Sequence, residues 1–287
     1  VILIDGSADG IFEGFTLLGN STEQVTDGIR LDWTTAARRS TSGNMFRDIR
    51  IRNLKCIVGI SLESNGTRQL DGNSLQNIVV TGYQVAGSWT TSGKYQKGIA
   101  FGNGSFGNIY DQRLYGVDVA GFYYGYYCNA SSFAMYSAQP EGNATDFFII
   151  PGAQTTISNI QSQSSGRFLI QTSAFSPIPV SVKDIVFVSS HMDPSTNIVD
   201  IYGGMWTFDN FCAPYTQTGG GGAYVGATFK IRGAFPTRPG VVTLNNITLN
   251  NSLISGILPT ATQAQIVVHN YSQFNTSTAT YTITNQA

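Results

Sequence analysis

The chain has 287 residues, of which 41% are hydrophobic and only 11% are charged, and its formal net charge is −1. Such a chain can bury a substantial core, but its net charge does not indicate nucleic-acid binding, and no apolar run reaches the roughly 18 residues that a membrane-spanning helix needs. The low charge and the abundance of Gly, Ser, Thr and Asn argue against a helical cytosolic enzyme and favour a β-rich protein with many turns.

A short pattern recurs along the chain and marks one class of strand. It consists of an apolar residue, any residue, then Gly, Asn or Asp, and then an apolar residue that starts an alternating stretch. The copies are Phe12–Leu17, Phe46–Ile51, Leu75–Val80, a reduced form at Phe106–Ile109, and then Ile157–Ile160, Val182–Phe187, Phe208–Phe211 and Leu244–Leu249. The gap between Asn108 and Asn159 spans about two ordinary periods, so we expect a degenerate copy between them. With that copy the mean period is about 29 residues.

A second pattern lies between copies of the first. It occurs at Gly28–Leu31, Gly59–Leu62 and Gly98–Phe101, with a looser version at Gly166–Leu169. Its apolar residues alternate with a period of two, which is typical of a strand with one buried face. Most repeats therefore carry at least two short strands separated by turns. The Asn or Asp of the first pattern suits a bend, because these residues tolerate the left-handed backbone conformation.

Repeats of this kind predict an all-β fold, a right-handed parallel β-helix solenoid. A short strand cannot bury its apolar face alone, but pairing in register with the equivalent strand of the next coil satisfies its backbone and aligns apolar side chains in columns. A β-sandwich or jelly roll also has many short strands but needs no repeated landmarks, and a leucine-rich repeat has a shorter and stricter period.

The repeats also predict how the chain divides and which residues lie inside. We expect about 8–9 coils over residues 1–250 and a short β-structured C-terminal segment, either a cap or a final coil, over residues 251–287. In the expected interior, Ile49, Ile78 and Ile185 share one column. The full set of interior residues is Ile29, Leu31, Ile49, Ile51, Ile60, Leu62, Ile78, Val80, Ile160, Ile185 and Ile247.

The second pattern places two carboxylates on neighbouring coils. If Ile29 and Ile60 point inward, Asp32 and Glu63 take equivalent outward positions, with Cα atoms about 4.8 Å apart. Two close carboxylates raise each other's pKa, which suits a general acid beside an ionised partner in glycoside hydrolysis. Asp32 and Glu63 are therefore the candidate catalytic residues, and replacing either with its amide should then abolish turnover and leave stability nearly intact. The alternative is that they are solvated carboxylates that splay apart or pair with Arg30.

Charged and aromatic residues supply candidates for glycan binding. Arg30, Arg50 and Arg52 belong to a basic stretch that can bind the carboxylates or sulfates of an acidic glycan. The alternatives for these arginines are a solvated outer face or salt bridges between subunits. The tyrosines lie in residues 122–127, where alternation puts about half of the rings outside, and their alternatives are the core or a subunit interface. The tryptophan directly follows Asp32. The candidate glycan-binding residues are Trp33, Arg30, Arg50, Arg52, Tyr124 and Tyr126.

The two repeated units, Phe/Leu-x-Asn/Asp-Ile and Gly-Ile-x-Leu, resemble those of the pectate-lyase-like β-helix superfamily. Within that superfamily, the general character of the sequence resembles the phage tail-spike and tail-fibre members. The resemblance covers about residues 10–250 and specifies the fold better than the activity. Members include polysaccharide lyases, glycoside hydrolases, deacetylating esterases and non-catalytic binders. The Asn-Thr-Asp, Asp-Asp and Gly-His-Gly elements of the galacturonan hydrolases are missing, as is the Arg-x-Pro-x-x-Arg of the pectate lyases.

The resemblance implies a homotrimer at an extracellular virion surface, beside other virion proteins, that recognises a host-surface polysaccharide. Whether the chain also depolymerises that polysaccharide stays open, and we favour binding without turnover. The alternatives are a secreted polysaccharide lyase or glycoside hydrolase, and a structural virion decoration or fibre protein without glycan binding. We expect no cofactor and no metal, because Cys56, Cys128 and Cys212 lie far apart and no spacing fits a zinc site.

Overall fold

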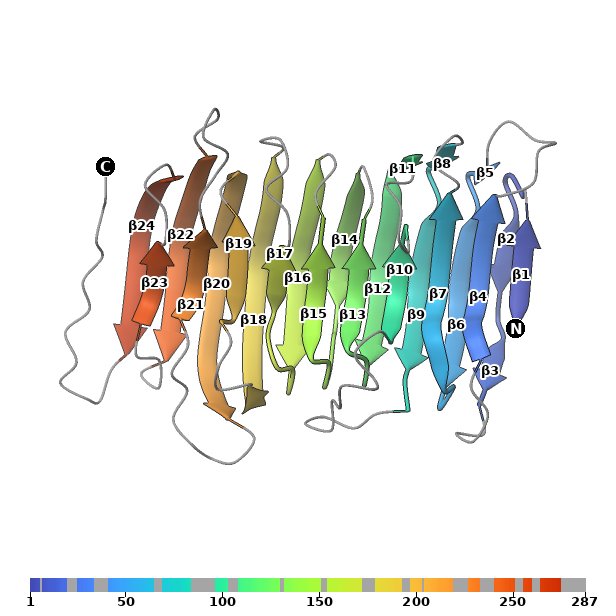
Figure 1. Ribbon diagram of the computed structural model, residues 1–287, viewed down its shortest axis with the longest axis horizontal. Helices are drawn as coiled ribbons and strands as arrows, with labels where there is room; N and C mark the ends of the chain where they lie inside the picture. The colour runs from blue at the N-terminus through green and yellow to red at the C-terminus, as the bar shows by residue number, and fades with distance from the viewer. Residues whose placement is uncertain are drawn as a thin grey trace.

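The computed structural model describes residues 1–5, 7–19, 25–33, 41–64, 69–83, 96–102, 108–129, 132–150, 154–171, 179–192, 197–202, 204–218, 227–232, 240–250, 255–259 and 264–274. Within these ranges the chain is all-β and contains no helix. It follows that the same ranges hold no helix long and apolar enough to cross a membrane. The strands form two long parallel sheets and one small one (Figure 1).

Sheet A has ten strands, which pair in the order β1 (Ile2–Asp5), β4 (Val25–Trp33), β7 (Cys56–Ser64), β10 (Lys97–Phe101), β13 (Tyr124–Cys128), β15 (Thr145–Ile149), β17 (Leu169–Gln171), β19 (Val199–Tyr202), β21 (Ala227–Arg232) and β23 (Ser255–Pro259). Sheet B pairs β2 (Ile11–Glu13), β6 (Met45–Arg52), β9 (Ser74–Thr81), β12 (Gln112–Ala120), β14 (Phe133–Ala138), β16 (Thr155–Gln163), β18 (Val180–Met192), β20 (Met205–Thr218), β22 (Gly240–Asn250) and β24 (Ala264–Phe274), and β3 (Thr16–Leu18) also pairs with β6. Sheet C pairs β11 (Asn108–Tyr110), β8 (Gln69–Asp71) and β5 (Thr41–Ser42).

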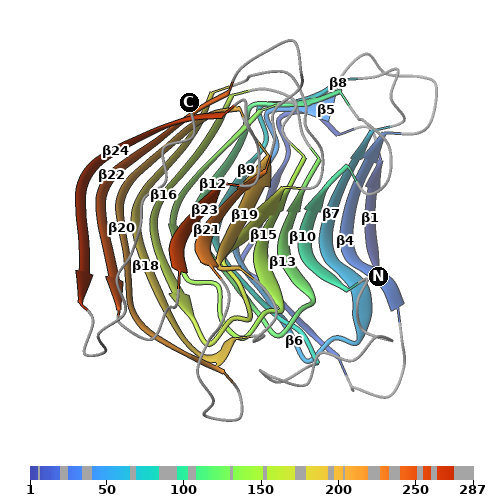
Figure 2. The ribbon, with the colours of Figure 1, turned by 60° about the vertical axis from the view of Figure 1, so that its left-hand side comes forward.

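The chain alternates between sheets A and B as it advances. It passes from β4 in sheet A to β6 in sheet B, returns to β7 in sheet A, and then enters β9 in sheet B. Within each sheet, a strand pairs in parallel with the strands of the preceding and the following pass, as the side view shows (Figure 2). This arrangement is compatible with a parallel β-solenoid. The strands β23 and β24 extend sheets A and B, so the described part of residues 251–287 continues both ladders.

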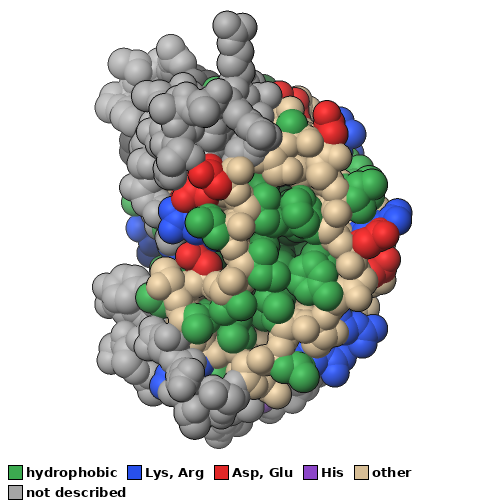
Figure 3. All heavy atoms as spheres, turned by 90° about the vertical axis from the view of Figure 1, so that its right-hand side faces the viewer, with side chains coloured by type: hydrophobic (Ala, Val, Ile, Leu, Met, Phe, Trp, Pro, Cys, Tyr) green, Lys and Arg blue, Asp and Glu red, His purple; other side chains and the backbone are tan. Residues whose placement is uncertain are grey.

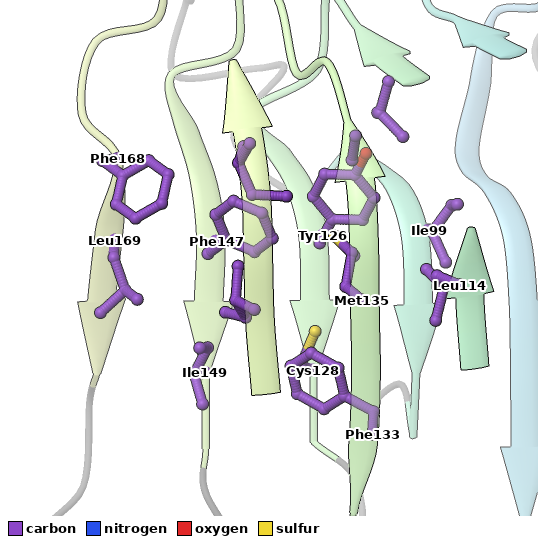
Figure 4. Packing of buried hydrophobic residues seen from close by; sticks show 14 of the residues in the cluster. Ile99, Leu114, Tyr126, Cys128, Phe133, Met135, Phe147, Ile149, Phe168 and Leu169 are labelled. Atoms are coloured by element: carbon purple, nitrogen blue, oxygen red, sulfur yellow. The ribbon is translucent and has the colours of Figure 1, made fainter. Parts of the chain in front are cut away.

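The core lies between sheets A and B. Every residue that the repeats place inside is at most 2% exposed. Ile49 pairs with Ile78 and Ile160 pairs with Ile185 at the position that follows the bend of sheet B, which confirms the predicted column. Close packing of the interior is visible where Tyr126 stacks on Phe147 (Figure 4). Seen from the N-terminal end, hydrophobic side chains fill the centre of the molecule and charged ones lie around them (Figure 3).

The first repeated pattern forms a ladder of bends in sheet B. Its third residue takes a positive φ in successive strands, at Gly14, Asp48, Asn77, Asn159, Asp184, Asn210 and Asn246. The side chains of neighbouring bends hydrogen-bond to each other: Asn77 Nδ2 donates to Asp48 Oδ1 (2.5 Å), and Asn210 Nδ2 donates to Asp184 Oδ1 (2.8 Å). The left-handed conformation explains why Gly, Asn and Asp recur at this position.

Two copies of the patterns were assigned wrongly. Asn108 lies in sheet C, and the bends between Asn77 and Asn159 are instead at Gly116 and Ser137, both with positive φ. A degenerate copy therefore exists, and Ser137 accepts a hydrogen bond from Asn159 in the same ladder (2.8 Å).

The looser copy of the second pattern, Gly166–Leu169, was also misaligned. Leu169 pairs with Phe147, which pairs with Tyr126 and through it with Ile99. The residue aligned with the Ile of the pattern is thus Leu169, two positions later than predicted, because the turns between strands vary in length.

Candidate functional site

Three carboxylates form a ladder on the outer face of sheet A. The register pairs Asp32 of β4 with Glu63 of β7, as the repeat predicts. It also pairs Asp32 with Asp5 of β1, which sequence reasoning missed. The signal was present, because Ile2–Asp5 has the same alternation as Ile29–Asp32. Neighbouring strands in a sheet lie about 4.8 Å apart, so the three carboxyl groups occupy one narrow column.

Asp32 is held in an ion pair instead of facing solvent. It is 6% exposed, and its Oδ2 lies 2.8 Å from Nη2 of Arg30. Its Oδ1 is buried and has no hydrogen-bond partner among the described residues. Glu63 is partly exposed and accepts a hydrogen bond from the Ser61 hydroxyl (2.5 Å). The alternative to a catalytic role was that the carboxylates are solvated and splay apart or pair with Arg30. Asp32 does pair with Arg30, but its carboxylate is buried and not solvated.

We therefore expect Asp32→Asn to lower the free energy of unfolding by about 1–2 kcal/mol, because it removes the nearer of the two carboxylates that pair with the partly buried Arg30, at 2.8 Å against 3.8 Å for Asp27. Denaturant unfolding measures the change. The matched control is Glu13→Gln, which breaks the more exposed pair between Glu13 and Arg47 and should leave the unfolding midpoint nearly unchanged. An equal decrease in the free energy of unfolding in the two variants would show that the Asp32–Arg30 ion pair stabilises the fold no more than the exposed pair does.

The outward rings of sheet A stack on each other. Tyr127 lies parallel to Phe148 (centroids 4.7 Å apart, 9° between planes), and Nζ of Lys97 lies 3.6 Å from the centre of the Tyr127 ring. Tyr124 contacts Tyr123, Tyr127 and Phe148, with ring centroids 4.7–5.9 Å apart. Burial lowers the pKa of Lys97, although the charge of Glu63 opposes this. The ring of Tyr127 is thus already in contact with Phe148 and Lys97. These contacts favour a structural role for the aromatic side chains over stacking on a sugar.

The remaining predicted binding residues do not gather at one place. Tyr126 is fully buried and its hydroxyl donates to the Val117 carbonyl, so its expected outward position was wrong. Arg50 and Arg52 are exposed on β6 of sheet B, away from the outer face of sheet A that carries Arg30. The backbone of Trp33 pairs with Ser64, and its side chain lies outside the described residues.

A groove runs along the outer wall of sheet B, at the starts of strands β12 to β22. It consists of two adjoining hollows of about 470 Å³ and 170 Å³, which share Gln154 and Thr156 in their linings. Its floor contains an in-register row of hydroxyl side chains, Thr156, Ser181, Thr207 and Thr243. We call this the sheet B groove.

A separate pocket of about 190 Å³ lies on the same wall, beyond the bend of the strands. Its polar lining consists of Thr81, Asp118, Gln139, Glu141, Gln161 and Gln163. We call it the Asp118 pocket. Burial raises the pKa of Asp118, and the hydrogen bond from the Gln139 N–H to Asp118 Oδ1 (2.9 Å) counteracts part of that rise. Sequence reasoning missed this pocket.

Among the described residues, no group of three or more His, Cys, Asp or Glu side chains is arranged to hold a metal ion. Cys56 and Cys128 are buried free thiols, and burial raises the pKa of Cys56 to about 12, so neither is poised as a nucleophile. No family model matches the chain, and searches of the curated proteins and of the solved structures returned no significant match.

Proposed function

We propose that this chain binds a linear polysaccharide along the outer wall of sheet B. The observation that supports this best is the hydroxyl row of the sheet B groove, Thr156, Ser181, Thr207 and Thr243. These side chains are partly exposed, and none has a hydrogen-bond partner among the described residues. Each hydroxyl offers one donor and two acceptor sites, repeated every ~4.8 Å along the wall. A polymer that repeats its own hydroxyl groups is the natural complement of such a surface.

The dimensions and the ends of the groove fit an extended sugar chain. From β12 to β22 the groove crosses five strand spacings, or about 24 Å, which accommodates several sugar units. At one end, Met205 and Val241 are 47% and 36% exposed and offer apolar surface to the C–H faces of sugar rings. At the other end, the exposed Arg113 offers a cation to an acidic substituent.

The proposed function also includes the fold family and the assembly of the chain. We take the parallel sheets to form a right-handed parallel β-helix of the pectate-lyase-like type, in which the outer walls are free to present side chains. A homotrimeric virion spike or fibre that recognises a host-surface polysaccharide is consistent with the low charge and the polar walls of the chain. These parts of the proposal rest on the resemblance of the repeated units.

Filling the groove should weaken polysaccharide binding. Ser181→Trp places a bulky ring in the middle of the hydroxyl row, and we expect it to weaken polysaccharide binding at least about tenfold, or roughly 1.4 kcal/mol. Leu3→Trp is the matched control, because Leu3 is 66% exposed on the outer face of sheet A. Biolayer interferometry would measure the affinities for a panel of dextran, xylan, galactan, polygalacturonate, alginate, hyaluronan and O-antigen lipopolysaccharide. Failure of the parent chain to bind any member, or loss of binding in Leu3→Trp alone, would contradict the proposal.

A further inference from the structure

A buried carboxyl group holds the turn that joins β14 of sheet B to β15 of sheet A. Asp146 is 0% exposed, and its Oδ1 accepts hydrogen bonds from Ser165 Oγ (2.6 Å) and Asn143 Nδ2 (3.0 Å). Ser162 Oγ donates to its Oδ2. Asn143 lies in the turn itself, whereas Ser162 and Ser165 belong to the following pass of the chain. Asp146 therefore connects two neighbouring passes from inside the core.

Asn143 extends this connection to a third pass. Its Oδ1 accepts the Phe122 N–H (3.0 Å), and its Nδ2 also donates to the Val119 carbonyl (3.0 Å), both in the preceding pass. Its own N–H donates to Ser165 Oγ (3.2 Å). The backbone amides of Phe122 and Asn143 therefore have side-chain acceptors that belong to one polar group in the core. We call this group the Asp146 cluster, and it consists of Asn143, Asp146, Ser162 and Ser165.

The outer side of the same turn forms part of the Asp118 pocket. Gln139, Pro140 and Glu141 line the pocket, and the Gln139 N–H donates to Asp118 Oδ1 (2.9 Å). Glu141 pairs with the passes on either side only through isolated bridges. A movement of the turn that begins at the Asp146 cluster would therefore change the wall of the pocket.

Ionisation of Asp146 places a negative charge in an apolar core. Burial raises the pKa of Asp146 to about 7 against the three hydrogen bonds of the cluster, and no charged side chain of the described residues contributes to the shift. The Tyr126 phenol faces it from β13, and its own pKa is raised by burial and by the charges of Asp118 and Asp146. Arg167 meets Asp146 through its carbonyl, which accepts the Asp146 N–H (3.0 Å). The protonated form can donate to Ser162 Oγ, whereas the ionised form gains most from contact with water.

We propose that the Asp146 cluster is a pH-sensitive latch, which holds the turn between β14 and β15 closed while Asp146 is protonated and releases it locally when Asp146 ionises. A ladder in which each strand pairs only with its neighbours can open at one place without unfolding elsewhere. Opening exposes the carboxylate to water, so each unit of pH between about 4 and 7 favours the open state about tenfold. This goes beyond the proposed function, because the sheet B groove lies at the starts of the strands and not at this turn.

Amide hydrogen exchange at pH 5 and pH 7, corrected for the intrinsic exchange rates, tests the latch. Exchange of the Phe122 and Asn143 amides should rise about 100-fold between these pH values in the parent chain and stay constant in Asp146→Asn, which cannot ionise. The internal reference is the buried amide of Asn44, which donates to Asn73 Oδ1 (3.1 Å) in a cluster without a carboxyl group. Local opening there does not expose Asp146, so its exchange should rise far less.

Two further variants make the test specific. Asp118→Asn is the matched control on the outer side of the turn, because it removes a charge but can still accept the Gln139 N–H, and it should retain the pH dependence at Asn143. Ser162→Ala keeps the test decisive should Asp146→Asn fail to fold. It removes a hydrogen bond that lowers the pKa of Asp146, so the rise in exchange should continue to higher pH than in the parent.

Three results would overturn the latch. The first is exchange of the Asn143 amide that does not change with pH in the parent chain. The second is a pH dependence that survives Asp146→Asn, which would assign it to another group. The third is an equal rise at Asn143 and Asn44, which would mean that pH acts on the stability of the whole fold and does not release this turn alone.

Discussion

The free energy of unfolding should fall as the pH rises from about 4 to about 7, because Asp146 is protonated in the folded protein over that range. Asp146 is fully buried, and burial raises its pKa to about 7, although hydrogen bonds from Ser162, Ser165 and Asn143 oppose the rise. Ser165 donates to Oδ1 (2.6 Å), as does Asn143 Nδ2 (3.0 Å), and Ser162 donates to Oδ2. The carboxyl group thus sits in a closed polar cluster inside an apolar core.

The direction follows from proton binding. Between pH about 4 and 7 the folded state holds a proton on Asp146 that the unfolded chain has released, so stability is highest at the acid end and levels off above about 7. The whole difference corresponds to roughly 4 kcal/mol. Urea unfolding at pH 4.5 and 7.5 measures it, with Asp146→Asn as the matched variant that stays neutral throughout. The variant should keep only the weaker dependence from Asp27 and Asp118, whose pKa values burial also raises. An undiminished pH dependence in Asp146→Asn would contradict this account.

The second large effect is expected at Gly59, where Gly59→Ala should lower the free energy of unfolding by about 2–3 kcal/mol. Glycines stand in a column of sheet A, and a Cβ at Gly28, Gly59 or Gly98 would lie 2.6–2.7 Å from the carbonyl oxygen of the glycine on the next strand of the sheet. At Gly59 the added carbon would also lie 2.5 Å from Cγ1 of Val80. Relief requires a backbone shift, which stretches the hydrogen bonds between adjacent strands.

Gly204→Ala is the matched control for this substitution. A Cβ at Gly204 would meet only the Trp206 side chain, at 3.3 Å, so its cost should stay below about 1 kcal/mol. Chemical unfolding of both variants gives the comparison. A Gly59→Ala variant as stable as Gly204→Ala would mean that the strands of sheet A can separate freely at this column, contrary to the close approach that the structure shows.

The sequence predicted the strand register best where the same local pattern repeats. Asp32 and Glu63 could be paired because each ends a Gly-Ile-x-Leu-x stretch, and the structure gives the same pairing. Tyr126 was misplaced because alternation was counted from Tyr124, whereas Gly125 and Tyr126 both lie on the buried side. Alignment of Tyr126 with Ile99, which the register shows, would have placed it inside.

The Asp118 pocket could not be predicted for a different reason. The bends beside it are Gly116 and Ser137. Gly116 fits the first pattern, but that copy was assigned to Asn108 instead, and Ser137 does not fit the pattern, so these strands were not aligned from the sequence. Glu141 lies outside the strands and meets its neighbours only through isolated bridges. Glu141 follows the bend at Ser137 by the same number of residues as its partner Ala120 follows Gly116, so it could be placed only once the bend at Ser137 was identified.

Hydroxyl-radical footprinting tests most directly whether a polysaccharide binds along sheet B. It compares the parent chain alone with the parent chain bound to the panel polysaccharide that binds most tightly. Met205 at the sheet B groove is 47% exposed, and Tyr115, which lies on β12 between Arg113 and Asp118, is 41% exposed. Leu3 on the outer face of sheet A is 66% exposed and serves as the internal reference. If the polysaccharide lies along sheet B, oxidation of Met205 and Tyr115 falls on binding while that of Leu3 stays constant. Protection of Leu3 with unchanged oxidation of Met205 and Tyr115 would contradict the account.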